Sequence, residues 1–194
     1  MIVLAAGGSS RFGKPKQLLV WEGKTLVRRA VRAALAARGP VVVIVGREHE
    51  MIAHELLGLP VTLVPNDHWE EGIGTSLHCG IKALPGCDAV VVLTCDQPLV
   101  NPEVVRQLIG TWEWEGKPIV ASAYARTLGV PALFTAEFFP QLRSLPNTQG
   151  AKSITTAHLD EVAQLSFEGG AIDIDTPEDY ERLTQKSFRN ASDS

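Results

Sequence analysis

The sequence predicts an α/β protein with a three-layer, Rossmann-like fold, in which helices cover both faces of a mostly parallel mixed sheet. Short aliphatic runs alternate with amphipathic helical segments along the chain, which is the order of elements in βαβ units. Residues 41–45 form an unbroken β-branched run, as expected for a strand that is buried on both faces. Ligands of such sheets bind at the carboxyl ends of the strands, so functional residues are expected there.

The remaining elements follow from apolar periodicity and cap residues. Four helices are expected to begin after cap residues: Thr25, either Thr75 or Ser76, Asn101 with Pro102 at the first helical position, and Thr176. A short helix is expected over residues 49–57, and further strands over 1–4, 61–64, 89–93, 119–123 and 132–134. Residues 1–186 are expected to form one domain, and the polar residues 187–194 a disordered C-terminal tail.

Composition argues against several classes of protein. The net charge of −4 argues against nucleic acid as a partner, because proteins that bind phosphate backbones carry a basic face. The aliphatic runs are too short to cross a bilayer, and no secretory signal precedes them, so no membrane partner is expected. Three cysteines without metal-like spacing fit reduced thiols. The sequence therefore predicts a soluble, cytoplasmic protein.

A glycine-rich, cationic turn follows the first strand. Gly7 and Gly8 carry no Cβ, so their backbone can approach an anion closely, and Arg11 and Lys16 supply positive charge at the same place. Pro15 stands where a kinase-type P-loop needs a hydroxyl, and the spacing of a dinucleotide fingerprint is absent. The turn therefore indicates a different kind of phosphate loop, and the alternative is a plain glycine turn with solvated charges.

The opening resembles a family pattern, L-A-A-G-x-S-x-R-x-G-x-x-K-x-L-L. It is carried here by Leu4, Ala5, Ala6, Gly7, Ser9, Arg11, Gly13, Lys16, Leu18 and Leu19. The chain is similar to small nucleotidyltransferases of the molybdenum cofactor type, above all to the molybdenum cofactor cytidylyltransferases. This resemblance implies a nucleotidyltransferase fold whose loop wraps a triphosphate, with Lys16 and Arg11 as catalytic contacts to the phosphates. It assigns nucleotide binding to Leu4, Ala5, Ala6, Gly7, Gly8, Ser9 and Gly13.

Asp96 lies just past the end of an expected buried strand. A carboxylate at that place suits Mg²⁺, which prefers one or two carboxylates together with substrate phosphates and water. The alternative is a turn or helix-capping aspartate before Pro98. The resemblance favours the metal, because the family carries D-x-P at this point and its aspartate binds the metal that bridges to the nucleotide.

Two further carboxylates stand near the C-terminus, at Asp173 and Asp175. Alternation along an expected strand would place both on the same side, where they would repel each other unless a cation or donors lie between them. The segment resembles the D-I-D-T-P-E-D ending of the family, which lies beside the metal site. We expect Asp173 to be the second metal ligand, while Asp175 can alternatively help to cap the last helix.

Two other segments gain a role through the resemblance. The element N-x-x-x-x-x-G-x-x-x-S lines the nucleotide pocket in the family, which makes Asn66, Gly74 and Ser76 candidates for contacts to base and ribose. The acceptor side is expected to include Gln97, Pro98, Gly129, Pro131 and Gly150. In relatives this half accepts a pterin. Residues 147–149 depart from the family's acidic and glycine positions, which leaves the identity of the acceptor open.

These parts predict a Mg²⁺-dependent enzyme that transfers CMP from CTP to the phosphate of a molybdopterin-type cofactor and releases pyrophosphate. The product would pass to a recipient molybdenum enzyme. A guanylyltransferase on the same cofactor is an alternative, although its relatives tend to have L-A-G-G at residues 4–7. A methylerythritol phosphate cytidylyltransferase-like enzyme is another alternative, because residues 15–17 are similar to the P-K-Q of that group, but residues 96–98 and the D-I-D ending fit it less well. A cofactor chaperone without catalysis is the alternative from another class, but a carrier needs no metal at an α-phosphate.

Overall fold

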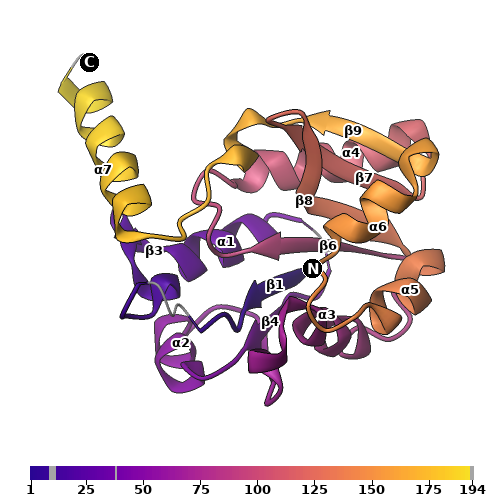
Figure 1. The fold of residues 1–194 in the computed structure, drawn as a ribbon, viewed down its shortest axis with the longest axis horizontal. Coiled ribbons are helices and arrows are strands. Elements are labelled where there is room, and N and C mark those ends of the chain that lie inside the picture. The colour runs from indigo at the N-terminus through magenta and orange to yellow at the C-terminus, as the bar shows by residue number, and fades with distance from the viewer. Residues whose placement is uncertain (9–11, 38, 193–194) are drawn as a thin grey trace.

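The computed structural model describes residues 1–8, 12–37 and 39–192, and the side chains up to residue 185. A seven-stranded sheet with the strand order β5-β4-β1-β6-β8-β7-β9 lies at the centre of the described structure (Figure 1). β8 runs antiparallel to both of its neighbours, while the remaining strand pairs are parallel. The predicted mostly parallel mixed sheet is thus confirmed. The strands are β1 Ile2–Ala5, β4 Val42–Val45, β5 Thr62–Pro65, β6 Ala89–Thr94, β7 Ile119–Tyr124, β8 Thr127–Thr135 and β9 Val162–Ser166.

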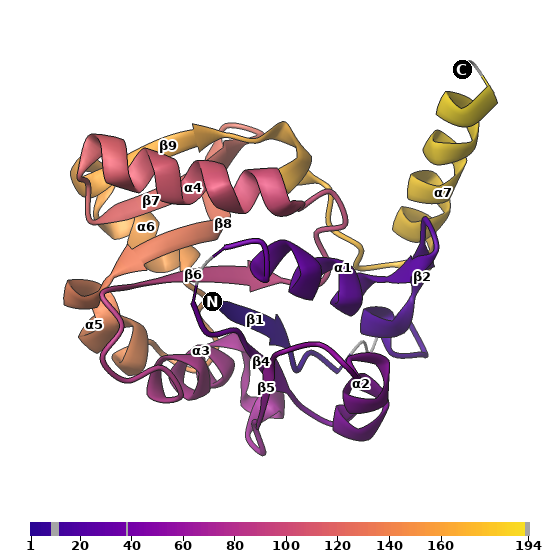
Figure 2. The ribbon, with the colours of Figure 1, turned by 180° about the vertical axis from the view of Figure 1, so that it is seen from behind.

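Helices cover both faces of the sheet, which confirms the predicted three layers. One face is packed by α1 Leu26–Ala34, α2 His49–Glu55 and α4 Pro102–Glu115, and Figure 2 shows this side. The other face is packed by α3 Ile73–Lys82, α5 Phe139–Ser144 and α6 Lys152–Ala157. Strand β1 is apolar throughout because both of its faces are buried: Ile2 and Leu4 point into one core, and Val3 and Ala5 into the other.

A small hairpin and the last helix form a third cluster at one end. β2 Val20–Trp21 pairs antiparallel with β3 Lys24–Thr25 through a turn in which Glu22 and Gly23 have positive φ angles. Helix α7, Pro177–Ser192, starts on this hairpin and projects from the body (Figure 1). The buried residues that join them are Leu19, Trp21, Leu26, Ile174 and Leu183.

Five short 3-10 turns complete the connections. They are η1 Lys16–Leu18, η2 Trp69–Glu71, η3 Ala136–Phe138, η4 Leu159–Glu161 and η5 Glu168–Ala171 among the described residues. Of these, η1 and η2 border the site described below. Among the described residues, no helix has both the length and the apolar composition that crossing a membrane requires.

Three of the predicted caps are confirmed. The Thr25 side chain accepts a hydrogen bond from the Arg28 backbone N–H, and Asn101 caps α4 with Pro102 at its first position. Thr176 caps α7 reciprocally, because the Thr176 backbone N–H donates to the Asp179 carboxylate while Asp179 N–H points back to the Thr176 hydroxyl. The disordered tail over residues 187–194 stays a prediction, although the backbone of α7 is helical up to Ser192.

Two expectations about local structure are wrong. Helix α3 begins at Ile73, so neither Thr75 nor Ser76 caps it; the Thr75 hydroxyl instead donates to the Gly72 carbonyl within the first turn. The segment after η5 is not a strand, because its backbone pairs with a loop: Ile174 N–H donates to the carbonyl of Asp96 at 2.9 Å. Hairpin β2–β3 and strand β9 were not expected from the sequence.

Candidate active site

Lys16 is the centre of a cluster of carboxylates at the carboxyl ends of β1 and β6. Its Nζ lies 2.8 Å from Oδ2 of Asp96 and 2.8 Å from Oδ1 of Asp175. The Lys16 side chain is 14% exposed, whereas those of Asp96 and Asp175 are 25% and 53% exposed. Burial disfavours the charged lysine, but the carboxylates outweigh it and raise the pKa of Lys16 above its usual value. Lys16 is therefore a fixed positive charge at this edge of the sheet.

Three separate segments bring these groups together. Lys16 begins η1 and Asp96 follows β6. Asp173 and Asp175 flank Ile174, which is fully buried in the third cluster and bonded through its N–H to Asp96. The buried isoleucine thus holds two acidic residues beside Asp96 without any strand.

Asp173 is electrostatically crowded. Partial loss of hydration, together with the carboxylates of Asp96 and Asp175, raises the pKa of Asp173 to about 6, against the opposing effect of Lys16. Asp175, not Asp173, contacts Lys16 directly. Within the described part of the chain, Asp173 is therefore the carboxylate of this cluster without a lysine Nζ at hydrogen-bond distance, and its role as a metal ligand stays a prediction.

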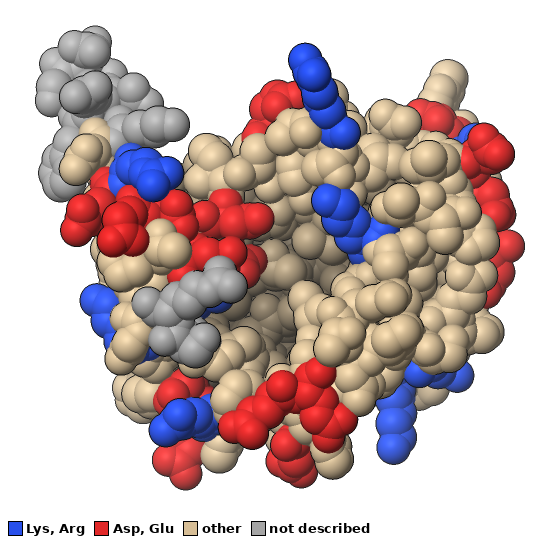
Figure 3. Space-filling view, viewed as in Figure 1, with Lys and Arg blue, Asp and Glu red and all other residues tan. Residues whose placement is uncertain are grey.

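A cavity of about 270 Å³ opens beside Lys16 and Asp96. Figure 3 shows a hollow in the middle of this face, with acidic side chains gathered to its upper left and below it. Of the residues expected to bind a nucleotide, Leu4, Ala6, Gly7 and Ser76 line the cavity. The other lining residues are Lys16, Gln17, Trp69, Gly72, Ile73, Thr94, Cys95 and Asp96.

The phosphate loop is described at its two ends. Ala5 is buried, and its carbonyl, like that of Gly7, accepts a hydrogen bond from the Gln17 side chain. Gly13 has a φ of +68°, a conformation that glycine adopts without strain. Ser9 and Arg11, both expected to contact the nucleotide, lie outside the described residues.

Trp69 separates the cavity beside Lys16 from a neighbouring one. Its indole lies where side chains of Gly8 and Gly46 would be: a Cβ on Gly8 would be 2.4 Å from Trp69 Cζ3, and one on Gly46 would be 2.9 Å from Trp69 Cγ. The second cavity, about 410 Å³, is lined by Trp69 together with Val45, Gly46, Arg47, His49, Pro65, Asn66 and Asp67. Trp69 thus presents an aromatic surface to both cavities.

Asn66 lies beneath this region and is only 3% exposed. Its Nδ2 donates to the hydroxyls of Thr75, at 2.8 Å, and Ser76, at 3.0 Å. Its Oδ1 accepts from the His68 backbone N–H at 3.0 Å. Asn66 therefore fastens the η2–α3 segment to the end of β5, and a contact of Asn66 or Ser76 with a nucleotide stays a prediction.

Gly74 packs against another loop. A Cβ there would lie 2.5 Å from the carbonyl oxygen of Pro146, and the Gly74 N–H donates to the Asn147 carbonyl at 2.8 Å. The Asn147 side chain in turn donates to Oε2 of Glu71 at 2.7 Å. The segment expected to hold the nucleotide is therefore joined to the loop expected to hold the acceptor.

The residues expected on the acceptor side are mostly engaged with the protein itself. Gln97 is 4% exposed, and its amide donates to the carbonyls of Val130, at 3.0 Å, and Gly170, at 2.9 Å. The Pro98 and Pro131 carbonyls accept from Arg29 and Ser122. A Cβ on Gly129 would lie 2.2 Å from the Tyr124 hydroxyl, while one on Gly150 would only touch Ile73. A direct role of these residues in acceptor binding stays a prediction.

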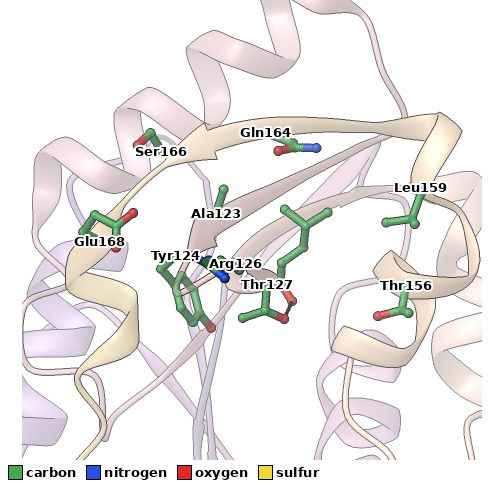
Figure 4. A pocket seen from close by; sticks show the side chains of 10 residues that line it. Ala123, Tyr124, Arg126, Thr127, Thr156, Leu159, Gln164, Ser166 and Glu168 are labelled. Carbon is green, nitrogen blue, oxygen red and sulfur yellow. Dashed lines mark hydrogen bonds between the residues drawn. The ribbon is translucent and has the colours of Figure 1, made fainter.

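A larger cavity of about 550 Å³ lies beside β7, β8 and β9 (Figure 4). Gln164, Ser166 and Glu168 border it from β9 and η5, and Thr156 and Leu159 from α6 and η4. Tyr124 joins this cavity to the carboxylate cluster, since burial and the charge of Asp173 both raise the pKa of its phenol. The remaining lining residues are Ala123, Arg126, Thr127 and Leu128.

The carboxylates around Lys16 determine which metal ion the site could hold. No group of three or more His, Cys, Asp or Glu side chains within the described part of the chain is arranged around a common metal position. A cation there would complete its shell with phosphate oxygens and water, which is how Mg²⁺ binds. The crowding that raises the pKa of Asp173 is also what a cation would relieve. The residues therefore fit an oxygen-preferring divalent cation whose other ligands are phosphate oxygens and water.

Sequence reasoning missed Gln17 and Trp69. Gln17 precedes Leu18 and Leu19, and this apolar flank signals that the turn after Lys16 is buried. An isolated tryptophan in a loop carries no such periodic signal, since its partners Gly8 and Gly46 become neighbours only through the sheet.

Comparison with known proteins places the geometry in context. A family model described as a MobA-like NTP transferase domain matches residues 1–162. The purine catabolism protein PucB of Bacillus subtilis is 27% identical, and the match covers 94% of each chain. The molybdenum cofactor cytidylyltransferase of Escherichia coli is 23% identical over 95% of this chain and 96% of that protein.

Solved structures show the same fold. Rv0371c from Mycobacterium tuberculosis superposes with a TM-score of 0.84, at 27% identity and 95% coverage of each chain. The structure of Rv0371c in complex with manganese superposes with a TM-score of 0.76, at 26% identity, covering 95% of this chain and 96% of that one.

Proposed function

Because the chain belongs to the MobA-like NTP transferase family and is thus an enzyme of the nucleotidyltransferase class, we propose that it transfers CMP from CTP to the phosphate of a molybdopterin-type cofactor. The observation that carries the proposal is the cluster of Lys16, Asp96 and Asp175, of which Lys16 and Asp96 line the 270 Å³ cavity. A fixed cation among carboxylates is the arrangement that binding of a metal–triphosphate complex needs.

The reaction needs no nucleophile from the protein. A phosphate oxygen of the acceptor attacks the α-phosphorus of CTP, a new phosphorus–oxygen bond forms, and the bond to pyrophosphate breaks. Burial and the charge of Asp96 raise the pKa of the Cys95 thiol to about 12, so this nearby thiol stays protonated at neutral pH. Catalysis then depends on positioning the substrates and on neutralising the charge that develops.

Lys16 provides the positive charge for the phosphates. Its stem is held by η1 and its Nζ is at hydrogen-bond distance from two carboxylates. When a phosphate oxygen replaces one of the two carboxylates, the Lys16 ammonium still has two anionic partners. Its charge therefore stays paired while the substrate binds. Arg11 would assist from the loop.

We assign Asp96 and Asp173 as the residues that would hold Mg²⁺ together with the nucleotide. The ion, when bound, would neutralise the charge of the reacting phosphates. Manganese in the similar Rv0371c structure supports dependence on a divalent metal. Asp175 would remain with Lys16 and keep its ammonium oriented.

Two observations support the substrates. The E. coli relative over the whole chain is a molybdenum cofactor cytidylyltransferase, which favours CTP and a phosphorylated pterin. The 550 Å³ cavity beside β8 lies next to Tyr124 and Gly129, near the proposed metal ligand Asp173. We propose that the acceptor occupies this cavity and that the product passes, in the cytoplasm, to a molybdenum enzyme.

Pyrophosphate release tests this function. The protein is incubated with Mg²⁺, molybdopterin and one of CTP, GTP, ATP or UTP, and thermal stability is recorded in parallel. A nucleotide at 100 times its dissociation constant stabilises by about 2.7 kcal/mol. Pyrophosphate release with CTP but with none of the other three nucleotides supports the proposal, and release with GTP would make the protein a guanylyltransferase. Pyrophosphate release with methylerythritol phosphate in place of molybdopterin would instead make the protein a methylerythritol phosphate cytidylyltransferase. Binding of the pterin without turnover would favour a carrier.

A further inference from the structure

Gln17 is a polar side chain almost entirely enclosed by the protein. It is 1% exposed, and it lies in η1 between Lys16 and Leu18. Its Nε2 donates to the Ala5 carbonyl at 3.0 Å and to the Gly7 carbonyl at 2.5 Å. A buried amide is costly unless it is bonded, and here both donor positions are used on one short stretch of backbone. That stretch is the junction between β1 and the phosphate loop.

These two bonds fix the direction of two peptide groups. In a trans peptide the C=O and the following N–H point in opposite directions. With the carbonyls of Ala5 and Gly7 held toward Gln17, the N–H groups of Ala6 and Gly8 are directed away from it. Ala6, Gly7 and Gln17 all line the 270 Å³ cavity. Gln17 therefore sets how the start of the loop presents its amides.

The same turn also carries Lys16. Adjacent side chains of η1 diverge: Lys16 reaches Asp96 and Asp175, whereas Gln17 reaches back to the loop. The position of the ammonium and the orientation of the loop amides are therefore set by one piece of backbone. A movement of η1 would change both together.

We propose that Gln17 is a positioning residue for the triphosphate. It acts through the backbone of residues 5–8, by holding the loop amides in the orientation that binds phosphate oxygens and in register with Lys16. This inference rests on the proposed nucleotide-transfer function, since it requires a triphosphate in that cavity.

Two variants of similar length test the role. Gln17→Met removes the donor and keeps the volume, and Gln17→Glu replaces the donor by a carboxylate that cannot donate when ionised. Gln107→Met is the matched control, because Gln107 is exposed on α4 and donates only to Glu103 among the contacts described. Dissociation constants for Mg–CTP and for inorganic triphosphate are measured by calorimetry at a temperature where circular dichroism shows each variant folded.

We expect both Gln17 variants to bind Mg–CTP and inorganic triphosphate about 10- to 100-fold more weakly, corresponding to the loss of one or two buried hydrogen bonds. The control should bind like the wild type. A purely structural role would lower the melting temperature and leave the affinity of the folded protein unchanged, which would overturn the proposal. Unchanged affinity in both Gln17 variants has the same meaning.

The wild-type protein gives a second measurement that does not depend on folding of a variant. On addition of inorganic triphosphate, the backbone amide signals of Ala6 and Gly8 should shift in nitrogen–proton spectra, while the side-chain amide of Gln17 keeps its hydrogen-bonded position. Triphosphate binding without a shift at Ala6 and Gly8 would overturn the role of Gln17 and leave the proposed function standing. No binding of triphosphate to the wild type would instead contradict the proposed function itself.

Discussion

Nζ of Lys16 lies 2.8 Å from Oδ2 of Asp96, although 80 positions separate the two residues in the chain. The contact exists because β1 and β6 are parallel neighbours whose carboxyl ends meet at one edge of the sheet. It joins the residue predicted to contact phosphates to the residue predicted to hold a metal. The site therefore has both charges in place before any substrate arrives.

Replacement of Lys16 tests its catalytic role. Lys16→Met should lower the turnover number for pyrophosphate release by about 10²–10³-fold, the scale of a single electrostatic contact to a transition state. Lys24→Met, at an exposed position of strand β3, is the control and should keep wild-type turnover. Equal turnover in the two variants would show that Lys16 does not act on the reacting phosphates.

Asp173 should make stability depend on pH. Its pKa is about 6 in the folded protein and near 3.8 ordinarily, so between about pH 4 and pH 6 the folded state retains a proton that the unfolded state has lost. The contribution of this proton to the free energy of unfolding is complete below pH 4 and is lost as pH rises through 6. In the absence of divalent metal, Asp173→Asn should remove this loss of stability with rising pH. It should then be more stable than the wild type above pH 6.

The expected gain is modest, because the Asp173 side chain is exposed and water screens its charge. We expect at most about 1 kcal/mol, or roughly 2–4 °C in melting temperature. Asp160→Asn, exposed in η4, is the control. Parallel pH profiles for wild type and Asp173→Asn in chelator would contradict the crowding of the three carboxylates.

Gly74 should tolerate no side chain. A Cβ there would lie 2.5 Å from the Pro146 carbonyl oxygen and 2.9 Å from that of Asn147, so backbone must move. Gly74→Ala should cost about 1–3 kcal/mol in the free energy of unfolding. Gly110→Ala in α4, where a Cβ meets nothing within 4 Å, should instead stabilise by about 0.5–1 kcal/mol. Urea denaturation measures both, and a Gly74 variant as stable as the wild type would refute the close packing.

Gly8 and Gly7 form a second matched pair. A Cβ on Gly8 would meet Trp69 at 2.4 Å, whereas one on Gly7 would meet nothing within 4 Å. Gly8→Ala should therefore displace the indole, lower the free energy of unfolding by about 1–3 kcal/mol and change tryptophan fluorescence. Gly7→Ala should leave stability and fluorescence nearly unchanged. Identical spectra for the two variants would mean that Trp69 does not pack on Gly8.

Much of the fold could be predicted from local sequence signals. The run at residues 41–45 and the caps at Thr25 and Asn101 are local features, and the structure confirms them. Strand β9 carries no comparable signal, because it has only five residues and its first two, Val162 and Ala163, are both buried, so that buried and exposed positions do not alternate. Segment 171–175 was predicted as a strand from alternation, yet its carboxylates are placed by the burial of Ile174.

The site could be predicted only for residues whose charge and position in the sequence indicate a chemical role. Lys16 and Asp96 stand out in the sequence by charge and position, and the structure brings them together. The contact of Asp175 with Lys16 and the engagement of the Gln97 amide by Val130 and Gly170 depend on tertiary neighbours. Such contacts leave no local pattern in the sequence.

The bonds around Asn147 have a thermodynamic consequence. Asn147 accepts from Gly74 N–H at 2.8 Å and donates to Glu71 at 2.7 Å, so η2–α3 and the loop at residues 146–150 cannot be displaced separately while both bonds persist. A ligand that shifts one segment changes the free energy of occupying the other by a coupling term, and this term is the same in either direction. For the proposed nucleotide and acceptor, these two hydrogen bonds of Asn147 would therefore couple the binding of one substrate to the binding of the other.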